Sequence, residues 1–287
     1  MRSRTGINIT LLKDPLTVLG ITVMTMFILM AVFANLIVTH DPLERIHVNG
    51  ALARLFPPSS QYWFGTTYYG ADVFSQTIMG SRVSVIVGLI SAINTTLIGT
   101  VIGLISGYYG KWIDDILMRI TDITYGIPVM AFAIILVAFL GPSIWNIILV
   151  ISLLLWRTTA RTIRSQVISI KERPFILSAI ASGASDFRIM FIHILPNVLS
   201  LSLLYATLGI GDAVLAESGL SFLGLGDPLK GSWGQMLYYS FLSASIRRAW
   251  WWVIPPGVCI SLFVMASYLI GRSYERTSIP QLRERIQ

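Results

Sequence analysis

The sequence predicts an all-α membrane protein with about six transmembrane helices. Of its 287 residues, 54% are hydrophobic and 12% are charged, whereas soluble domains contain roughly 25% charged residues. A water-soluble fold of this size cannot bury so much apolar surface, so we expect lipid to surround the chain. The apolar residues also gather into runs whose lengths approach the roughly 20 residues that a helix needs to cross a bilayer.

Six apolar runs are the candidate spans. They are Leu16–Thr39, Val83–Tyr108, Ile123–Leu140, Ser143–Trp156, Val198 to about Leu220, and Trp251–Gly271. The first run is too long for the apolar part of a cleavable signal peptide, so we interpret it as a span. The polar stretch between the first two runs is expected to be an outer loop that extends to Arg82.

The basic residues indicate how the chain is oriented, because cytoplasmic loops carry an excess of Lys and Arg. With the N-terminus inside, 15 of the 21 basic residues are cytoplasmic, and the other six are Arg45, Arg54, Arg82, Lys230, Arg247 and Arg248. Both termini are therefore expected in the cytoplasm. Residues 1–82 would form an N-terminal tail, a first helix and the outer loop, residues 83–275 the core, and residues 276–287 a cytoplasmic tail.

Three glycines, Gly99, Gly103 and Gly107, follow each other at four-residue spacing in the second run. This spacing puts them on one face of a helix, where another helix can approach closely. We favour packing within the bundle over a pore-lining role for this face.

A structured cytoplasmic loop is predicted over residues 157–196, because this segment is far longer than a turn requires. Pro174 suits the first position of a short helix, and Gly183 suits a left-handed stop after it. Ser185 can cap a second helix, which is expected to end just before Pro196.

The first of these short helices presents apolar residues on one face. Phe175 pairs with Ala179, and Ile176 pairs with Ile180, on adjoining strips. Such a face suits a groove on a partner protein. It could equally lie on anionic lipid headgroups, because five basic residues precede it: Arg157, Arg161, Arg164, Lys171 and Arg173.

Two acidic residues, Asp212 and Glu217, lie in the fifth run. An ionisable group within a membrane is costly and usually faces a cavity or a partner. One hypothesis is that Asp212 or Glu217 lines a translocation path and meets a cationic group of the substrate. The alternative is a pairing between helices or a position near the outer boundary.

Enzymatic chemistry is not indicated by the sequence. Gly110-Lys111 lacks the spacing and the hydroxyl residue of a nucleotide-binding P-loop, and His40, His47 and His193 have no metal-ligand spacing. The single cysteine, Cys259, supports no disulfide framework. The basic residues lie in short loops between apolar runs, so we expect a lipid bilayer as partner and no nucleic acid.

Several short motifs together resemble the binding-protein-dependent ABC importer permeases. Residues 178–185 (SAIASGAS) and 193–197 (HILPN) resemble the cytoplasmic EAA loop of that family, with its central Gly183 and the later Pro196. Met118-Arg119 with Asp122 and Pro128 resembles a second family element, and Gly141-Pro142-Ser143 a third.

Two further motifs resemble the dipeptide, oligopeptide and nickel branch of the family, whose subunits are DppC/OppC-like. Residues 220–226 (LSFLGLG) with 232–234 (SWG) resemble its outer loop, and residues 64–66 with 70–73 resemble an element before the second span. The sequence departs from the family pattern at Leu177, where an acidic residue is usual, and at Ser178, where the first Ala is usual. The resemblance covers roughly residues 10 to 275.

This resemblance implies a MetI-like type I ABC importer permease core. The EAA loop would then couple this chain to ATPase subunits through Pro174, Phe175, Ala179, Ile180, Ser182, Gly183, Ala184, Ser185, His193 and Pro196. It implies a homologous second permease, one or two ATPase subunits and an extracytoplasmic solute-binding protein as partners. It also implies a bacterial or archaeal plasma membrane.

The function that the resemblance implies is import of a solute, most often a di- or oligopeptide. ATP and Mg would be bound by the partner subunits, with no cofactor in this chain. The alternative class is an ion-coupled secondary transporter, although the two halves show no internal repeat of the kind common in such carriers.

Overall fold

Helices long and apolar enough to cross a membrane dominate the computed structural model, which describes residues 14–278. Five such helices occur in this range, and a sixth span results if one sharply bent pair is counted together. The prediction of an all-α membrane protein with about six spans is confirmed. Residues 1–13 of the expected N-terminal tail and residues 279–287 of the expected C-terminal tail lie outside the described range.

The elements follow one another as helices interrupted by one small hairpin. In order they are α2 (Pro15–Val32), α3 (Ala34–Ile37), β1 (His47–Val48), β2 (Ala51–Leu52), α4 (Val73–Tyr109), α5 (Lys111–Gly126), α6 (Val129–Leu140), α7 (Ile144–Leu155), α8 (Arg157–Lys171), α9 (Pro174–Ala181), α10 (Asp186–Arg188), the π-helix η1 (Ile189–Ile194), α11 (Leu195–Leu220), the π-helix η2 (Ser221–Leu225), α12 (Trp233–Leu242) and α13 (Trp250–Ser278).

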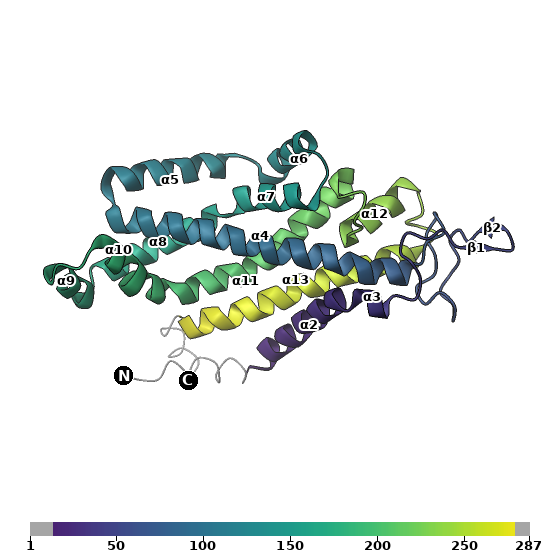
Figure 1. Ribbon diagram of the computed structural model, residues 1–287, viewed down its shortest axis with the longest axis horizontal. Coiled ribbons are helices and arrows are strands. Elements are labelled where there is room, and N and C mark those ends of the chain that lie inside the picture. The colour runs from purple at the N-terminus through teal and green to yellow at the C-terminus, as the bar shows by residue number, and fades with distance from the viewer. Residues whose placement is uncertain (1–13, 279–287) are drawn as a thin grey trace.

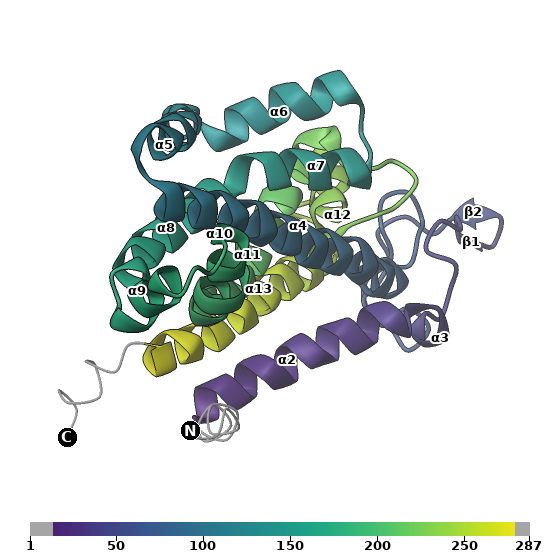
Figure 2. The ribbon, with the colours of Figure 1, turned by 60° about the vertical axis from the view of Figure 1, so that its left-hand side comes forward.

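The molecule has two distinct ends (Figures 1 and 2). One end, which we name the α9 end, carries α9 and α10 together with the start of α2 and the finish of α13. The other, the hairpin end, carries β1 and β2, whose Asn49-Gly50 loop has positive φ at both residues as a tight hairpin turn requires. Helix α4 runs between the two ends and packs against α2, α7, α8 and α11.

Helix α4 begins ten residues earlier than the sequence predicts. The carboxylate of Asp72 accepts a hydrogen bond from the Ser75 amide at 2.8 Å and caps the helix. Thr77 and Ser81, which make this segment look like a loop, are buried and donate to the helix carbonyls of Val73 and Ile78. The expected start at residue 83 is wrong because these hydroxyl groups are satisfied inside the helix and need no water.

The third predicted span is broken. Helices α5 and α6 meet at 90°, and Ile127 between them is extended, with φ −93° and ψ 125°. The residue before a proline is pushed out of the helical region by the proline ring, and Pro128 follows. The expectation of one helix over residues 123–140 is therefore wrong. This range contains the end of α5, the break at Ile127-Pro128 and the whole of α6.

The fourth predicted span is longer than expected. Helices α7 and α8 form one span from Ile144 to Lys171, so the segment after Trp156 continues the helix and is not a loop. Two aspartates of α5 form ion pairs with arginines on the polar face of α8. The part of the predicted loop that remains outside long helices is short and consists of α9 and the turns around it.

The predicted stop before Pro196 is also wrong. The π-helix η1 leads directly into α11, and Pro196 stands in the first turn of that helix. A proline inside a helix removes one amide donor and clashes with the carbonyl four residues before it. A π-type turn changes the bonding pattern there, so the chain passes through Pro196 without a break.

The glycine face of α4 packs within the bundle, as the sequence predicts. A Cβ atom added to Gly103 would lie 2.5 Å from the Ala160 carbonyl oxygen, and one added to Gly107 would lie 2.8 Å from that of Arg164. A Cβ atom at Gly99 would lie 2.6 Å from the Thr159 Cβ. Helices α4 and α8 thus touch through their backbones.

Candidate functional site

Helix α9 is framed by the start and stop signals that the sequence predicts. Pro174 occupies its first position, and Gly183 has φ +75° after its last turn. The Gly183 amide donates to the Ile180 carbonyl at 2.9 Å, and the Ala184 amide donates to the Ala179 carbonyl at 3.1 Å. These two bonds close the helix with the left-handed cap that favours glycine.

The turn after α9 is tied to the end of α4. Ser185 caps α10 by accepting from the Arg188 amide at 3.4 Å. The Tyr108 hydroxyl donates to the Asp186 carboxylate at 2.7 Å. This contact joins α4 to α10 and holds the loop that follows α9 in place.

The apolar residues of α9 are divided between an anchor and a free surface. Ile176 is completely buried and packs in a cluster with Ile163, Val167 and Ile189. Phe175, Leu177 and Ile180 remain 44%, 53% and 45% exposed. The expectation that Ile176 and Ile180 share a docking strip is wrong, because Ile176 is used to fasten α9 to the bundle.

The other residues predicted for this site lie around α9 and on the next helix. Ser182 is exposed and donates to the Ser178 carbonyl at 2.8 Å. Ala179 and Ala184 are half-buried. His193 belongs to η1 and Pro196 to α11, so these two are not part of the α9 surface.

Most of the basic residues before α9 are bound within the chain. Arg161 forms an ion pair with Asp122 at 2.6 Å, and Arg164 forms one with Asp114. The guanidinium groups of Arg157 and Arg161 also lie over the Tyr125 ring, at 4.6 and 4.3 Å from its centroid. These contacts attach α5 to α8.

Lys171 is likewise occupied, because its ammonium group donates to the Tyr108 carbonyl and lies 5.3 Å from the Tyr108 ring centroid. Within residues 14–278, only Arg173 of the five basic residues before α9 has a side chain without a hydrogen bond, ion pair or ring contact. Groups committed to internal partners are poorly available to lipid headgroups, which favours the partner-groove interpretation of α9.

The two acidic residues of α11 lie in different surroundings. Glu217 is fully buried and accepts hydrogen bonds from Ser221 at 2.7 Å and from Ser84 and Ser218 at 3.4 Å. Asp212 is exposed on the side of α11, and the Tyr268 hydroxyl of α13 donates to it at 2.8 Å. Glu217 is thus enclosed by the chain, whereas Asp212 stays accessible from outside it.

The segment after Glu217 is folded back tightly onto the bundle. Trp233 is fully buried and donates from its indole nitrogen to the Thr77 carbonyl of α4 at 2.9 Å. A Cβ atom at Gly234 would lie 2.5 Å from the Ser218 carbonyl oxygen. Gly224 has φ +85°. Trp233 and Gly234 of the SWG motif therefore allow α12 to pack closely against α11 and α4.

Arg82 of α4 binds the end of α2, a contact that the sequence did not reveal. Its guanidinium group donates to the carbonyl oxygens of Ala31 at 2.8 Å and Val32 at 3.2 Å, and to the Asn35 amide oxygen at 2.8 Å. It thereby caps the end of α2 from α4. Only its placement beside an apolar run could have hinted at this, because a charged side chain next to a membrane-spanning segment usually needs a partner.

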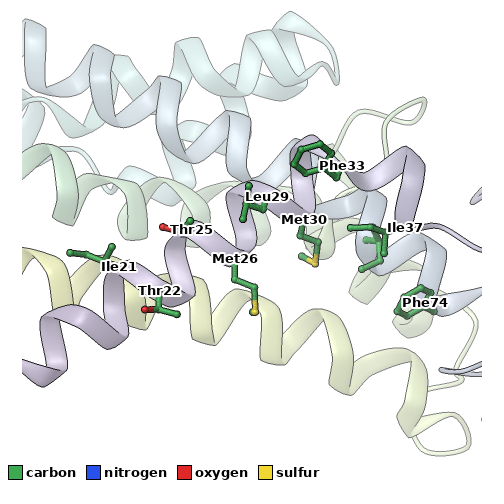
Figure 3. A pocket seen from close by; sticks show the side chains of 10 residues that line it. Ile21, Thr22, Thr25, Met26, Leu29, Met30, Phe33, Ile37 and Phe74 are labelled. Carbon is green, nitrogen blue, oxygen red and sulfur yellow. The ribbon is translucent and has the colours of Figure 1, made fainter.

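An apolar groove of about 760 Å³ runs along α2 (Figure 3). Its side chains come from α2, from Ile37 of α3 and from the first turns of α4, and include Met26, Phe33 and Phe74. A groove of this composition on a membrane-spanning helix suits hydrocarbon chains.

Comparison with known proteins agrees with this architecture. Residues 99–278 match the family described as "Binding-protein-dependent transport system inner membrane component". The chain is 40% identical over 273 residues to the dipeptide transport system permease protein DppC of Alkalihalophilus pseudofirmus, covering 94% of this chain and 88% of that one.

Two relatives from Bacillus subtilis extend this comparison. The dipeptide permease DppC is 35% identical, covering 94% of this chain and 83% of its own length. The oligopeptide permease OppC is 34% identical, and the alignment covers 95% of this chain and 88% of OppC. The predicted resemblance to the DppC/OppC-like permeases is confirmed, and the chain belongs to the binding-protein-dependent transport system inner membrane components.

Proposed function

We propose that this chain is a membrane-spanning permease subunit of an ATP-binding-cassette importer that carries dipeptides or oligopeptides. A homologous second permease completes the path, and an extracytoplasmic binding protein delivers the solute. The substrate class is supported by the names of the relatives, which align with nearly the whole chain.

The observation that carries the coupling mechanism is the divided surface of α9. Ile176 anchors the helix in the bundle, while Phe175, Leu177 and Ile180 face outward. A helix held this way can transmit a push or pull to the spans as a rigid lever. We infer that the outward residues dock in an apolar cleft of an ATPase subunit, which binds ATP and Mg and supplies the hydrolysis.

The α9 end is proposed to face the cytoplasm and the hairpin end the outside of a bacterial or archaeal plasma membrane. The excess of basic residues in the segments assigned to the inside supports this orientation. The start of α2 and the finish of α13 lie at the α9 end (Figure 1), so both termini would be cytoplasmic.

Asp212 is our candidate for the translocation path. It is an exposed carboxylate within a membrane-spanning helix, and such groups usually face a water-filled cavity or a partner. We propose that it attracts the ammonium group of a peptide. Glu217 is a weaker candidate for this role because it is enclosed by serines of the same chain.

The test is affinity purification of the chain from its native membrane in mild detergent, followed by mass spectrometry. We expect one or two P-loop ATPases and a second permease to be recovered. Phe175→Ser combined with Ile180→Ser should remove the ATPases but retain the second permease. Ile246→Ser, at an exposed isoleucine of the hairpin end, is the matched control and should retain both.

Two outcomes would contradict the proposal. One is a solitary chain that transports in proteoliposomes without ATP, which would favour the ion-coupled carrier. The other is unchanged ATPase recovery with the α9 double variant, which would locate the coupling contact elsewhere.

A further inference from the structure

A second pocket, of about 490 Å³, lies between α4 and α12. Both α12 and the start of α4 are at the hairpin end (Figure 1). The first turns of α4 form one wall, and α12 with residues 228–231 forms the other. Residues 41–43 and Ile144 of α7 complete the rim. A concave site of this size with mainly apolar walls and a few polar groups is typical of small-ligand binding.

One polar side chain of this pocket forms no side-chain hydrogen bond with the described part of the chain. The Gln235 side chain lines the pocket and is only 6% exposed. Within residues 14–278 its side-chain amide makes no hydrogen bond, although its backbone amide donates to Ser232. The unpaired amide atoms are not among those sealed inside the protein, so they are accessible and present a donor and an acceptor that a bound molecule can satisfy.

A second amide is partly available on the opposite wall. The Gln76 side-chain nitrogen donates to the Pro42 carbonyl at 3.0 Å, which leaves its oxygen without a donor among the described residues. Two side-chain amides facing one space match the donor and acceptor of a peptide bond.

The pocket also carries opposite charges. Lys230 is exposed on its rim and its ammonium group has no partner within residues 14–278, and Asp41 uses one carboxylate oxygen to accept from the Leu43 amide at 2.9 Å. Arg82 also lines the pocket, but three of its five N–H groups are already donated to the end of α2 and to Asn35 of α3. The remaining walls are apolar, with Met79 and Met236 among them.

We propose that this pocket binds a short zwitterionic peptide at the outer face of the permease, before it enters the translocation path. Gln235 pairs with a peptide amide, Lys230 with the terminal carboxylate and Asp41 with the terminal ammonium. The methionines accept an apolar side chain, which suits a site that takes many side chains, since methionine adapts to different shapes. This inference rests on the proposed function for its substrate class, and the site is separate from Asp212.

The experiment measures binding of the dipeptide Ala-Phe to the assembled transporter in lipid nanodiscs, without binding protein and without ATP. Gln235→Leu preserves the side-chain volume and should weaken binding about tenfold, as expected for one lost hydrogen bond in a buried site. Lys230→Gln should weaken it by a similar factor. Arg247→Gln removes a positive charge at the same end, outside the pocket, and should leave the affinity unchanged.

N-acetyl-Ala-Phe-amide has both charges blocked and should bind much more weakly than Ala-Phe. Equal affinities of the two ligands, or equal affinities of the Lys230→Gln and Arg247→Gln proteins, would overturn the pocket proposal. Displacement of a tightly held phospholipid rather than binding of Ala-Phe would also overturn it, because a lipid headgroup carries similar charges.

A separate assay distinguishes failure of the pocket from failure of the proposed function. The complete transporter, with binding protein and ATP, should import Ala-Phe in proteoliposomes. Import with no binding to the nanodisc sample would overturn only the pocket. Loss of both would overturn the peptide assignment as well.

Discussion

Glu217 illustrates how the surroundings of a single residue add to what its chemical type suggests. A carboxylate inside a hydrophobic run suggests a functional site. In the fold it is surrounded by Ser84 of α4, Ser218 of α11 and Ser221 of η2. Hydroxyl donors from three elements converge on it, so its main physical effect is to hold those elements together.

Replacement of Glu217 should separate its charge from its hydrogen bonds. Glu217→Gln keeps the size and an acceptor oxygen, and serine hydroxyls can both donate and accept, so we expect folding and transport to persist. Glu217→Leu leaves the serines without an acceptor and should lower the stability by about 1–3 kcal/mol. Thermal unfolding of the purified protein measures this, and a transport defect of Glu217→Gln without loss of stability would instead support a role in the path.

Asp212 should behave in the opposite way. Asp212→Asn keeps the acceptor for the Tyr268 hydroxyl but removes the charge, so stability should change little while import of a peptide with a free amino group falls. Tyr268→Phe is the control for the lost hydrogen bond, because it leaves the carboxylate charge in place. Unchanged import by the Asp212→Asn protein would show that the Asp212 charge has no role in the translocation path.

At Gly183 the backbone alone limits substitution. It has φ +75°, and a Cβ atom placed there would have no neighbour within 4 Å, so an added side chain meets no steric contact. Gly183→Ala should cost about 1–2 kcal/mol from the left-handed conformation and should reduce the stimulation of ATPase activity by the binding protein. Gly183→Asn should do less harm, since Asn tolerates this conformation, and equal behaviour of the two variants would argue against backbone strain.

At the scale of elements, the close contact of α4 and α8 supports the part of the bundle to which α9 is anchored. Helix α4 has 37 residues and at about 1.5 Å per residue is much longer than the roughly 30 Å hydrocarbon core. Its last turns and α8 hold the cluster in which Ile176 is anchored. Under the proposed mechanism, a movement of α9 would therefore act on both helices.

A methyl group on Gly103 should disturb this contact, because its Cβ would lie 2.5 Å from the Ala160 carbonyl oxygen. We expect Gly103→Ala to destabilise the protein by about 1–3 kcal/mol. Gly257→Ala is the matched control, since a Cβ there has no atom within 4 Å and alanine favours a helix. Thermal unfolding of both proteins in the same detergent makes the comparison, and equal midpoints would show that α4 and α8 can separate at no cost.

At the scale of the whole molecule, the N-terminal helix and the core form one unit. Arg82 of α4 binds the last carbonyls of α2, and Gly20 of α2 lies against Leu269 of α13. The boundary expected between residues 82 and 83 falls inside α4. Under the proposed orientation, the α9 end of this unit faces the cytoplasm and the hairpin end faces the outside.

Cysteine labelling in cells tests that orientation. In a Cys259→Ala background, Glu44→Cys at the hairpin end should react with a membrane-impermeant maleimide from outside. Ser182→Cys at the α9 end should react only after the membrane is permeabilised. Both positions are exposed, so the reverse labelling pattern would mean that the chain is inserted the other way.

The membrane class, the glycine face of α4 and the turn between α9 and α10 could all be predicted from the sequence. Each depends on local chemistry: apolar runs need lipid, small residues at four-residue spacing share a helix face, and proline and glycine mark the ends of α9. The family motifs were recognisable for the same reason, because each is a short run of adjacent residues.

The tertiary structure decided everything that depends on partners distant in the chain. The start of α4 is fastened by distant elements, because Trp233 of α12 donates to the Thr77 carbonyl and Arg82 donates to the Ala31 carbonyl of α2. The arginines of α8 stay helical because α5 supplies carboxylates to them. Ile176 faces inward although its neighbours face outward. Helical periodicity can assign a residue to a face, but only the packed bundle determines which face is buried and which remains free to meet a partner.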